Sequence, residues 1–407
     1  MPNIHIDQND LSDYWYERAV YWHGNKPSRS RSLGPAMAES RPLILSGHGM
    51  GLRINHGALE AQNGFTHYPQ KREITRIFPG DRDAPSRIVM LGGSGAITLN
   101  VLSWLAEQNI PLVQLDYRGH VVAAIGHSGI GHDSALVRLQ IATSEATGKS
   151  RELGAWLIRK KLLATRETML ACLPDNDLRK RADACITDGL RKLDRPWELS
   201  KEALLGIEGK CAVLYFDAWR SVPITWKGTA RKPIPESWMS IGVRRGEANQ
   251  SNRFARHPVQ AMLNYGYAVI ESLIRIETAK VGLDMTVGFL HQSRYERPAL
   301  IMDLIEPIRA SVDRVILDMI RTNAFSPADF TIGPEGVVRL HPQLGRALVV
   351  RIGTPRSIEA LIAAFLTQIG FKVPELNSGR GQTWMAQRAL QRHSADSANR
   401  RHKGWQV

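Results

Sequence analysis

Hydrophobic and polar residues follow two different rhythms in successive regions of the chain. From Leu43 to Ile125, short apolar runs alternate with glycine-containing turns, a pattern typical of β-strands. The stretch from Ile97 to Ala106 differs, because its apolar residues recur at the spacing of a helix. Strands are expected at Leu43–Ser46, Gly51–Asn55, Ala58–Ala61, Arg72–Ile77, Ser86–Leu91, Ile110–Asp116 and His120–Ile125.

After Gly131 the glycines become rarer and the pattern becomes mainly helical. A long polar loop, 223–256, interrupts it, and a loop of that length inside a compact domain is usually functional or mobile. A pair of short strands is expected late in this region, at Phe330–Gly333 and Gly336–Leu340. The predicted helices are Ala135–Ala146, Ser150–Cys172, Asp177–Leu193, Lys201–Ser221, Pro258–Ala279, Pro298–Thr322 and Ile358–Ile369.

The sequence therefore predicts an α+β protein, with a small, mainly β domain at 41–131 and a larger all-α domain at 132–372. Residues 1–40 form an N-terminal extension with a Ser-, Pro- and Arg-rich stretch, expected to be a mobile linker. Its aromatic residues indicate a short helix that docks at an unspecified place. Residues 373–407 are basic and polar. A solvated tail is the favoured interpretation, and an auxiliary DNA contact is the alternative.

Charge gives the first indication of a partner. Lys and Arg number 53 against 39 Asp and Glu, which leaves a net charge of +14. A basic excess of this size favours a polyanionic partner, of which nucleic acid is the commonest. Phosphate contacts alone would not specify a base sequence.

Composition indicates a soluble, cytoplasmic protein. Hydrophobic residues make up 43% and charged residues 23%, the proportions of globular domains. No apolar stretch approaches the roughly 20 residues of a membrane span, and the N-terminus has no signal-peptide pattern. The cysteines, Cys172, Cys185 and Cys211, lack C-x-x-C spacing. We interpret them as buried thiols in a reducing compartment, not as disulfides or a zinc site.

Candidate chemistry centres on residues 288–309. His291 ends an apolar run, and a predicted helix after it carries Asp303 and Glu306. Carboxylates three residues apart lie on one face of a helix. One imidazole with carboxylate oxygens suits Mg²⁺ or Mn²⁺ better than a soft metal. The ordinary alternative is that each acid caps a helix or pairs with an arginine.

Glu208 offers a further carboxylate. It lies between Gly206 and Gly209, at a predicted helix start where small neighbours would let a ligand or another helix approach. The helix macrodipole alone would favour an acid there, so capping is a serious alternative.

The predicted helix that begins at Pro258 carries an apolar stripe and a second face with Gln260, Asn264, Tyr267 and Glu271. Beside a metal site, a polar and aromatic face of this kind suits contact with nucleic acid. An ordinary solvated face is the alternative.

Two other motifs carry less weight. The glycine-rich stretch 92–95 lacks the lysine of a P-loop and the G-x-G-x-x-G spacing. We therefore favour a turn with Ser94 near the helix N-terminus over a phosphate cradle. The spacing of His120, His127 and His132 matches no standard metal site.

Four motifs taken in order resemble the Cas1 family, the metal-dependent endonucleases and integrases of CRISPR adaptation. They are Ile-Glu208-Gly followed by Tyr215-Phe, Pro258-Val-x-Ala-Met-Leu-Asn-Tyr-Gly-Tyr, Gly282-Leu-Asp-x-Thr-Val-Gly-Phe-Leu-His, and Asp303-Leu-Ile-Glu-Pro-Ile-Arg. The likeness extends to Leu45-Ser-Gly-His-Gly and Gly92-Gly-Ser-Gly-Ala-Ile-Thr-Leu. It runs from about Leu43 to Lys372. One departure is Gln260, where the family usually has asparagine.

The resemblance implies a β domain that mediates dimerisation and an α domain that holds the catalytic site. It implies Mg²⁺ or Mn²⁺ bound by Glu208, His291 and Glu306. It also implies double-stranded or branched DNA as substrate, a homodimer, and association with a small Cas2 dimer. The reaction would be attack of a spacer 3′-hydroxyl on a repeat-end phosphate, or strand cleavage with water as nucleophile. Weaker expectations for residues around the metal or against DNA are Asp303, Asn264, Tyr265, Arg294, Arg309 and Arg253.

The two acids of the last motif should play different roles. Pro307 cannot donate a hydrogen bond to the carbonyl of Asp303, so the helix should kink or restart there. That irregularity would angle Glu306 towards His291 and Glu208, and would leave Asp303 to orient His291 or a bound water.

Two other functions stay open at this point. A casposase-like integrase of a mobile element shares the family's site, and a non-catalytic DNA-binding scaffold would use the same charge. Neighbouring genes would separate the first of these from a CRISPR enzyme. The basic tail shows no clear helix-turn-helix pattern, which weakly favours CRISPR.

Overall fold

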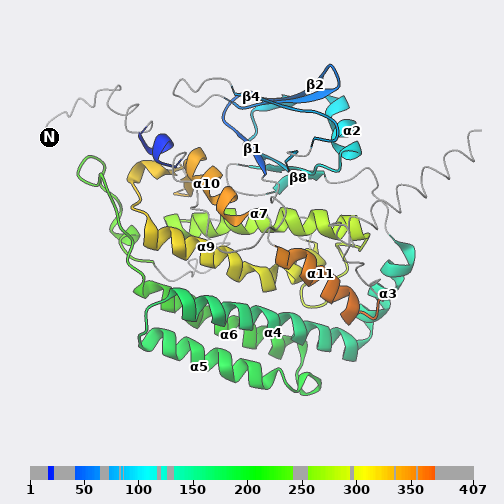
Figure 1. Ribbon diagram of the computed structural model, residues 1–407. Helices are drawn as coiled ribbons and strands as arrows, with labels where there is room; N and C mark the ends of the chain where they lie inside the picture. The colour runs from blue at the N-terminus through cyan, green and yellow to red at the C-terminus, as the bar shows by residue number, and fades with distance from the viewer. Residues whose placement is uncertain are drawn as a thin grey trace, which may run out of the picture.

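The computed structural model describes residues 17–22, 42–64, 73–81, 84–85, 87–116, 121–125, 133–241, 255–293, 298–333, 336–353 and 356–371. From Leu43 to Ile125 most of the elements are strands, which form two sheets, and helices dominate after that (Figure 1). The α+β prediction is confirmed. None of the described helices is both long enough and apolar enough to cross a membrane.

Two four-stranded sheets form the β region. The first has the order β1-β5-β7-β8, in which only the β7–β8 pair is antiparallel. The second has the order β4-β3-β2-β6, in which β6 runs parallel to β2. The strands are β1 (Leu43–Ser46), β2 (Met50–Asn55), β3 (Ala58–Gln62), β4 (Ile74–Ile77), β5 (Ile88–Leu91), β6 (Gly95–Ile97), β7 (Leu112–Leu115) and β8 (Val121–Ile125), with helix α2 (Leu99–Glu107) after β6.

The first sheet has a hydrophobic core on each of its faces. In β5, Ile88 and Met90 belong to a small core shared with the second sheet and α2, whereas Val89 belongs to the large core of the helical region. The same alternation in β7 separates Leu112 from Val113, as the period of two along a strand requires. The β region is therefore continuous with the helical region through a shared core.

Strand β6 was not predicted, and α2 begins later than expected. Gly95 lies so close to β2 that an added Cβ would come within 2.4 Å of the Met50 carbonyl oxygen, so only glycine fits this ladder. Ser94 does not cap the helix. Its hydroxyl accepts a hydrogen bond from Gly49 N–H at 3.1 Å, and Thr98 occupies the N-cap position. His120, His127 and His132 lie outside the described residues.

Helices pack in layers beneath the first sheet (Figure 1). Helix α7 runs under that sheet, and α9 packs against α7. Helix α4 packs against α9 and α6, and α5 is outermost, against α6 and α4. The helices are α3 (Ser134–Glu145), α4 (Thr147–Cys172), α5 (Asp177–Lys192), α6 (Lys201–Ala218), α7 (Pro258–Val281), α8 (Ala299–Ile305), α9 (Arg309–Thr322), α10 (Pro342–Ile352) and α11 (Arg356–Gln368). Short 3₁₀ turns are η1 (Pro196–Glu198), η2 (Trp219–Ser221), η3 (Glu236–Trp238), η4 (Glu306–Ile308) and η5 (Pro327–Asp329).

Two local predictions in this region are confirmed and one element was missed. The strand pair is present as β9 (Phe330–Ile332) and β10 (Val338–Leu340). The predicted helix at Pro298–Thr322 restarts as α8, η4 and α9, with Pro307 inside the 3₁₀ turn. Helix α10 was missed. It packs on α7, where Tyr265 lies against Gly345, so tertiary contacts support a segment whose local pattern was unclear.

The described part of the long polar loop is packed. The Trp226 and Trp238 rings stack with centroids 5.8 Å apart and contact Phe325 and Phe330. The Phe325 N–H donates to the Thr225 carbonyl at 2.9 Å. These aromatic side chains add to the large core, and residues 242–254 lie outside the described part of the chain.

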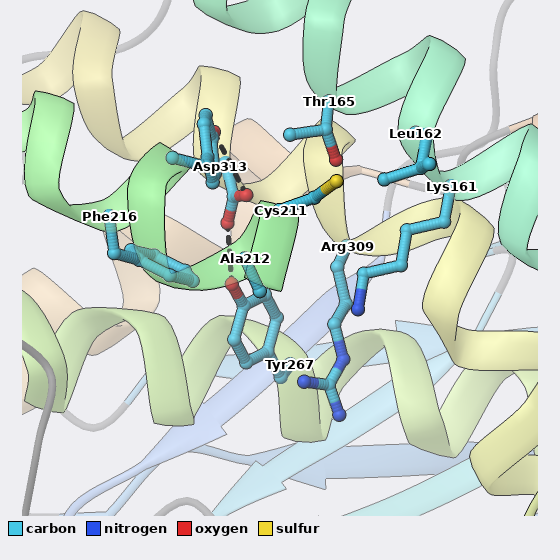
Figure 2. A pocket seen from close by; sticks show the side chains of 10 residues that line it. Lys161, Leu162, Thr165, Cys211, Ala212, Phe216, Tyr267, Arg309 and Asp313 are labelled. Carbon is cyan, nitrogen blue, oxygen red and sulfur yellow. Dashed lines mark hydrogen bonds between the residues drawn. The ribbon is translucent and has the colours of Figure 1, made fainter. Parts of the chain in front are cut away.

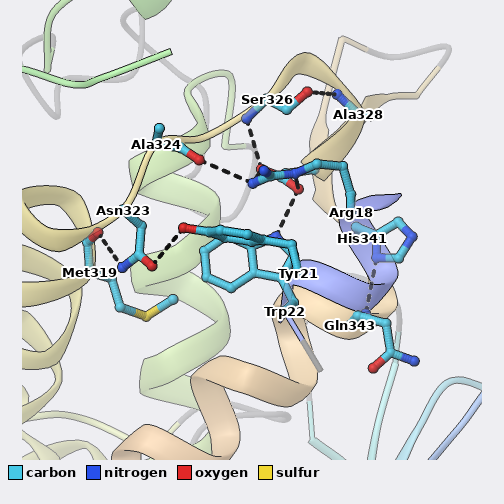
Figure 3. A network of polar contacts seen from close by, with 11 residues as sticks. Arg18, Tyr21, Trp22, Met319, Asn323, Ala324, Ser326, Ala328, His341 and Gln343 are labelled. Atoms are coloured by element: carbon cyan, nitrogen blue, oxygen red, sulfur yellow. Dashed lines mark hydrogen bonds and ion pairs between the residues drawn. The ribbon is translucent and has the colours of Figure 1, made fainter. Parts of the chain in front are cut away.

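Residues 17–22 are helical, and the place where they dock is now visible (Figure 3). Arg18 and Trp22 both donate to the buried carboxylate of Asp329, in the turn before β9. The Tyr21 hydroxyl donates to the Asn323 side chain at 3.0 Å. Residues 17–22 are thus fixed to the helical region between the end of α9 and the start of β9.

Candidate metal centre

Three charged side chains meet between α4, α6 and η4. The Lys161 ammonium on α4 hydrogen-bonds the Glu208 carboxylate on α6 and the Glu306 carboxylate on η4. Their side chains are 12%, 24% and 9% exposed, respectively. Helix α4 packs against both α6 and η4, so the packing of these elements holds the two carboxylates around one cation.

Lys161 reaches this place because it lies on the buried stripe of α4. It follows Leu157 by four residues and Ile158 by three, and it precedes the buried Leu162 and Thr165. Positions three and four apart share a helix face, so the lysine stem packs among core residues and its ammonium ends at the carboxylates. The neighbouring charges of Glu306 and Glu208 raise the pKa of Lys161 despite burial, which by itself would lower it.

The sequence indicated that Glu208 lies at a helix start, and the structure shows that it does not. Helix α6 begins at Lys201, so Glu208 lies in its interior, and the acid of the first turn is Glu202. The macrodipole and capping explanation therefore does not apply to Glu208. A Cβ added at Gly206 or Gly209 would meet nothing within 4 Å. These glycines leave open space beside Glu208 and do not serve a close helix contact.

Glu306 is held by two basic side chains. Its Oε2 contacts Lys161, and its Oε1 forms an ion pair with Arg309 Nη2 at 3.2 Å. Burial would raise the pKa of Glu306, but the charges of Arg309 and Lys161 outweigh it and lower the pKa to about 2. Glu306 is therefore ionised at neutral pH.

The His291 imidazole is oriented by Asp303. Its Nδ1 lies 2.7 Å from Asp303 Oδ1, so the Nε2 atom is directed away from that carboxylate. Asp303 also accepts the backbone N–H groups of Phe289, Leu290 and His291, at 2.6, 3.1 and 3.0 Å. The hydrogen bond to Asp303, with burial opposing it, raises the pKa of His291, and the Glu306 charge adds to the increase.

Gly288 makes this arrangement possible. A Cβ at this position would come within 2.5 Å of the Ala299 Cβ and 2.9 Å of Asp303 Oδ2. Only glycine lets the loop after α7 pass this close to α8. Asp303 is fully buried and receives four donors. The oxygens of Asp303 therefore hold the loop in place. Of Asp303 and Glu306, only Glu306 shares the Lys161 ammonium with Glu208.

The donor types fit a hard divalent ion, although the side chains do not yet enclose one. Among the described residues, no three His, Cys, Asp or Glu side chains gather closely enough to hold a metal as they stand. Glu208 and Glu306 nevertheless already hold one cation between them, the Lys161 ammonium. Carboxylate oxygens with one imidazole suit Mg²⁺ or Mn²⁺.

A small cavity with a mixed polar and apolar lining lies behind these residues (Figure 2). It has a volume of about 30 Å³, and Lys161, Thr165 and Arg309 are among its lining residues. The buried Asp313 accepts the hydroxyls of Tyr215 at 3.1 Å and Tyr267 at 2.6 Å. Burial, followed by the Asp313 charge, raises the pKa of Tyr215 well above its usual value.

The proposed polar face of α7 is only partly exposed, because Gln260, Asn264 and Glu271 are half-buried and Tyr267 is buried. Tyr267 is 7% exposed and faces Asp313, so the solvated-face interpretation does not fit it. Tyr265 is equally buried, against Gly345, and its expected place around the metal or against DNA stays a prediction. Asn264 is half-buried. Helix α7 is surrounded by the sheet and by α8, α9, α10 and α11, which explains its burial.

The three arginines expected near the site have different outcomes. Arg309 pairs with Glu306, lies 4.9 Å above the centroid of the Tyr267 ring, and keeps 26% of its side chain exposed. Arg253 and Arg294 lie outside the described residues.

The free cysteines are less buried than expected. Cys211 is buried, but Cys172 and Cys185 are half-buried. The Sγ atoms of Cys185 and Cys211 lie 3.7 Å apart, where α5 packs on α6.

Two buried polar residues of this region were missed by sequence reasoning. The signal for Lys161 was a lysine at a core position of α4, between Ile158 and Leu162. Asp313 gave a similar signal, because it stands next to the buried Val312 on α9. Charged residues are rarely buried without a partner, so each position pointed to a polar network.

Known proteins resemble this chain in sequence and in fold. The sequence model of the family described as CRISPR associated protein Cas1 matches residues 82–352. A CRISPR-associated endonuclease Cas1 of Archaeoglobus fulgidus is 29% identical over 304 residues, which cover 70% of this chain and 80% of that protein.

Two solved structures share the fold. A structure titled as a casposase bound to integration product has a TM-score of 0.64 at 22% identity, covering 87% of this chain and 99% of the other. A Cas6-RT-Cas1–Cas2 complex has a chain with a TM-score of 0.57 at 18% identity, covering 91% of this chain and 36% of that one. Because the family match spans most of the chain, including both sheets in part and nearly all the helices, this protein belongs to the Cas1 family of CRISPR-associated proteins.

Proposed function

We propose that this protein is a divalent-metal-dependent DNA endonuclease and integrase of CRISPR adaptation. The observation that carries the proposal is the convergence of Glu208 and Glu306, from two different elements, on one cationic group. The imidazole of His291, which Asp303 orients, would be the third metal ligand, and the charge of Glu306 contributes to its raised pKa. Family membership and the endonuclease named in Archaeoglobus fulgidus support DNA as the substrate.

Glu208, His291 and Glu306 would hold Mg²⁺ or Mn²⁺. When bound, such an ion polarises a phosphoryl oxygen and stabilises the charge that develops during transfer. Asp303 keeps the imidazole in one orientation, with Nδ1 turned to the carboxylate and Nε2 available as a ligand. Arg309 keeps Glu306 in place, and its exposed part provides positive charge beside a DNA phosphate.

The reaction is a transesterification. The 3′-oxygen of the spacer forms a bond to the phosphorus at the repeat end. The bond that breaks joins that phosphorus to the 3′-oxygen of the preceding nucleotide on the same strand. The attacking hydroxyl loses a proton and the leaving oxygen gains one, so no oxidant or energy source is needed. Water in place of the hydroxyl would give nicking or cleavage of duplex or branched DNA.

The assembly we propose is a homodimer bound to a small Cas2 dimer. We assign dimerisation to residues 41–131 and the chemistry to 132–372. Exposed apolar side chains around the second sheet support this, since Ile74, Phe78 and Leu99 are 47%, 59% and 82% exposed. The solved complex that contains Cas1 and Cas2 supports the second partner. Because the first sheet shares its core with the helices, the full chain should be used to measure the oligomeric state by light scattering. A monomeric mass at high concentration would contradict the proposed dimer.

An integrase of a mobile element is the second candidate. The casposase structure favours it as far as fold is concerned. The Cas1 family match and the Cas1 relative favour the CRISPR function. Integration assays with a CRISPR repeat and with terminal inverted repeats, run side by side, separate the two.

The deciding experiment is integration of a duplex with a free 3′-hydroxyl across a Mn²⁺ titration. Glu208→Ala, His291→Ala and Glu306→Ala should each abolish strand transfer. Asp303→Asn should keep measurable activity and mainly raise the Mn²⁺ concentration required, because Asp303 acts through His291. Glu202→Ala, on the same helix as Glu208 but exposed in its first turn, is the matched control.

DNA binding should persist in all these variants. It should weaken steeply with salt, because a protein of net charge +14 releases counterions from the phosphates it neutralises. Near-normal turnover of Glu306→Ala with an inactive Asp303→Asn would show that the two acids have exchanged roles.

A further inference from the structure

Lys161 occupies the place that the proposed metal ion would need. Its ammonium hydrogen-bonds Glu208 and Glu306 at once, and these are two of the three expected ligands. Lysine and metal would compete for the same two carboxylates. The ammonium has only donors, so it cannot itself serve as a ligand to the ion.

Local charge leads to the same conclusion. Glu208 and Glu306 carry two negative charges, and Lys161 and Arg309 carry two positive charges. The cluster is therefore balanced without a metal. A divalent ion added while the ammonium stayed in place would leave a large positive excess in a mostly buried site. Departure of the ammonium reduces that excess.

The side chain has room to leave. Lys161 lines the cavity of about 30 Å³ behind the site, together with Thr165 and Asp313 (Figure 2). A cavity of this volume is large enough for a group the size of a water molecule, which is close to the size of an ammonium group. The lysine stem can thus rotate without repacking α4 against α6.

We propose that Lys161 is a positioning residue that holds Glu208 and Glu306 together in the metal-free protein and is displaced from them when the divalent ion binds. The proposal rests on the metal site proposed above. It assigns to Lys161 two effects of opposite sign. Lys161 organises the empty ligand set, and it competes with the ion for that set.

The test is Mn²⁺ binding to the full-length, DNA-free protein by isothermal titration calorimetry. Lys161→Met keeps a long side chain and removes the ammonium, so it should bind Mn²⁺ at least tenfold more tightly than wild type. Lys160→Met is the matched control. Lys160 is the exposed neighbour, with its ammonium 5.1 Å from the Trp156 ring centroid, and its loss should leave Mn²⁺ affinity unchanged. Equal or weaker binding by Lys161→Met overturns the proposal.

A second measurement uses only the wild-type protein. Acetylation of lysines followed by mass spectrometry should label Lys161 several-fold faster with saturating Mn²⁺ than without it, and should label Lys160 equally in both. Unchanged labelling of Lys161 also overturns displacement. Failure of the proposed metal site looks different. In that case wild type and Lys161→Met would both bind no Mn²⁺ while DNA binding persisted.

Discussion

Two clusters in the helical region pair a basic side chain with a buried carboxylate, and they differ in how that carboxylate is held. Asp329 is fully buried and receives four donors, from Arg18 Nε and Nη2, Trp22 Nε1 and the Ser326 N–H, at 2.6–2.8 Å. Every donor is fixed by the backbone or by packing (Figure 3). Nothing in this cluster can be exchanged for a ligand.

The Glu208–Glu306 cluster contains the same kinds of charge but a different supply of donors. Two carboxylates share one lysine ammonium, and the Glu208 side chain keeps a quarter of its surface exposed. Lysine is a flexible point charge, whereas the planar guanidinium of Arg18 forms a rigid two-pronged contact. The comparison teaches that a buried ion pair is structural when rigid groups satisfy it fully, and exchangeable when a mobile group satisfies it in part.

A histidine in each region shows the same contrast. At the metal centre, the hydrogen bond to Asp303 raises the pKa of His291. Beside the Asp329 cluster, burial and then the charge of Arg18 lower the pKa of His341 to about 4. His341 Nδ1 accepts the Gln343 N–H at 3.1 Å and so caps α10. A neutral imidazole serves the fold there, whereas the carboxylate partner of His291 favours its protonated form.

The largest expected effect comes from breaking the structural cluster. Asp329→Ala would leave the Arg18 guanidinium, only 9% exposed, without its partner. We expect a loss of about 3–5 kcal/mol in the free energy of unfolding, the usual cost of an uncompensated buried charge. Urea unfolding measures it. Glu198→Ala is the control, because its pair with Arg195 is exposed and 3.6 Å long, and it should cost less than about 1 kcal/mol. Similar losses in both variants would contradict the contrast.

An intermediate effect is expected from disturbing the metal centre without touching a ligand. Gly288→Ala forces the loop away from α8, since the new Cβ would lie 2.8 Å from the Ala299 backbone carbon. Loss of the Asp303 contact to His291 should weaken Mn²⁺ binding about 10- to 100-fold, as calorimetry would show.

Gly206→Ala is the matched control for this substitution. It lies two residues from Glu208, and its Cβ would meet nothing. It should leave Mn²⁺ affinity unchanged and stabilise α6 by up to about 1 kcal/mol. If Gly288→Ala bound Mn²⁺ as well as Gly206→Ala does, the loop would not be what orients His291.

The most gradual effect is a pH dependence in the structural region. Because the pKa of His341 falls from 6.5 unfolded to about 4 folded, the unfolded chain takes up a proton first as pH decreases. The stability due to neutral His341 is therefore lost between about pH 6.5 and 4, by at most about 1.4 kcal/mol per pH unit. His341→Asn keeps a capping side chain and should flatten the slope of unfolding free energy against pH. An unchanged slope would contradict the assignment.

Local sequence determined much of this protein. Short apolar runs between turns predicted the strands β5 and β7, and the restart of the helix at Pro307 followed from a missing N–H. The order of the motifs identified the family, and with it Glu208, His291 and Glu306 as candidate ligands. The strands, the helix restart and the family were confirmed, because each depends on neighbours within a few residues or on a motif read directly from the chain. The assignment of the three ligands stays a prediction.

Only the tertiary structure decided which charges meet. Lys161 reaches Glu208 and Glu306 across 47 and 145 residues of sequence, and Arg18 reaches Asp329 across 311. Tyr267 was expected on a polar face of its helix, but the sheet and surrounding helices bury it together with Tyr265. The physical reason is that the free energy of a buried charge depends on the partners that folding brings to it. Those partners come from distant segments whose packing no local pattern encodes.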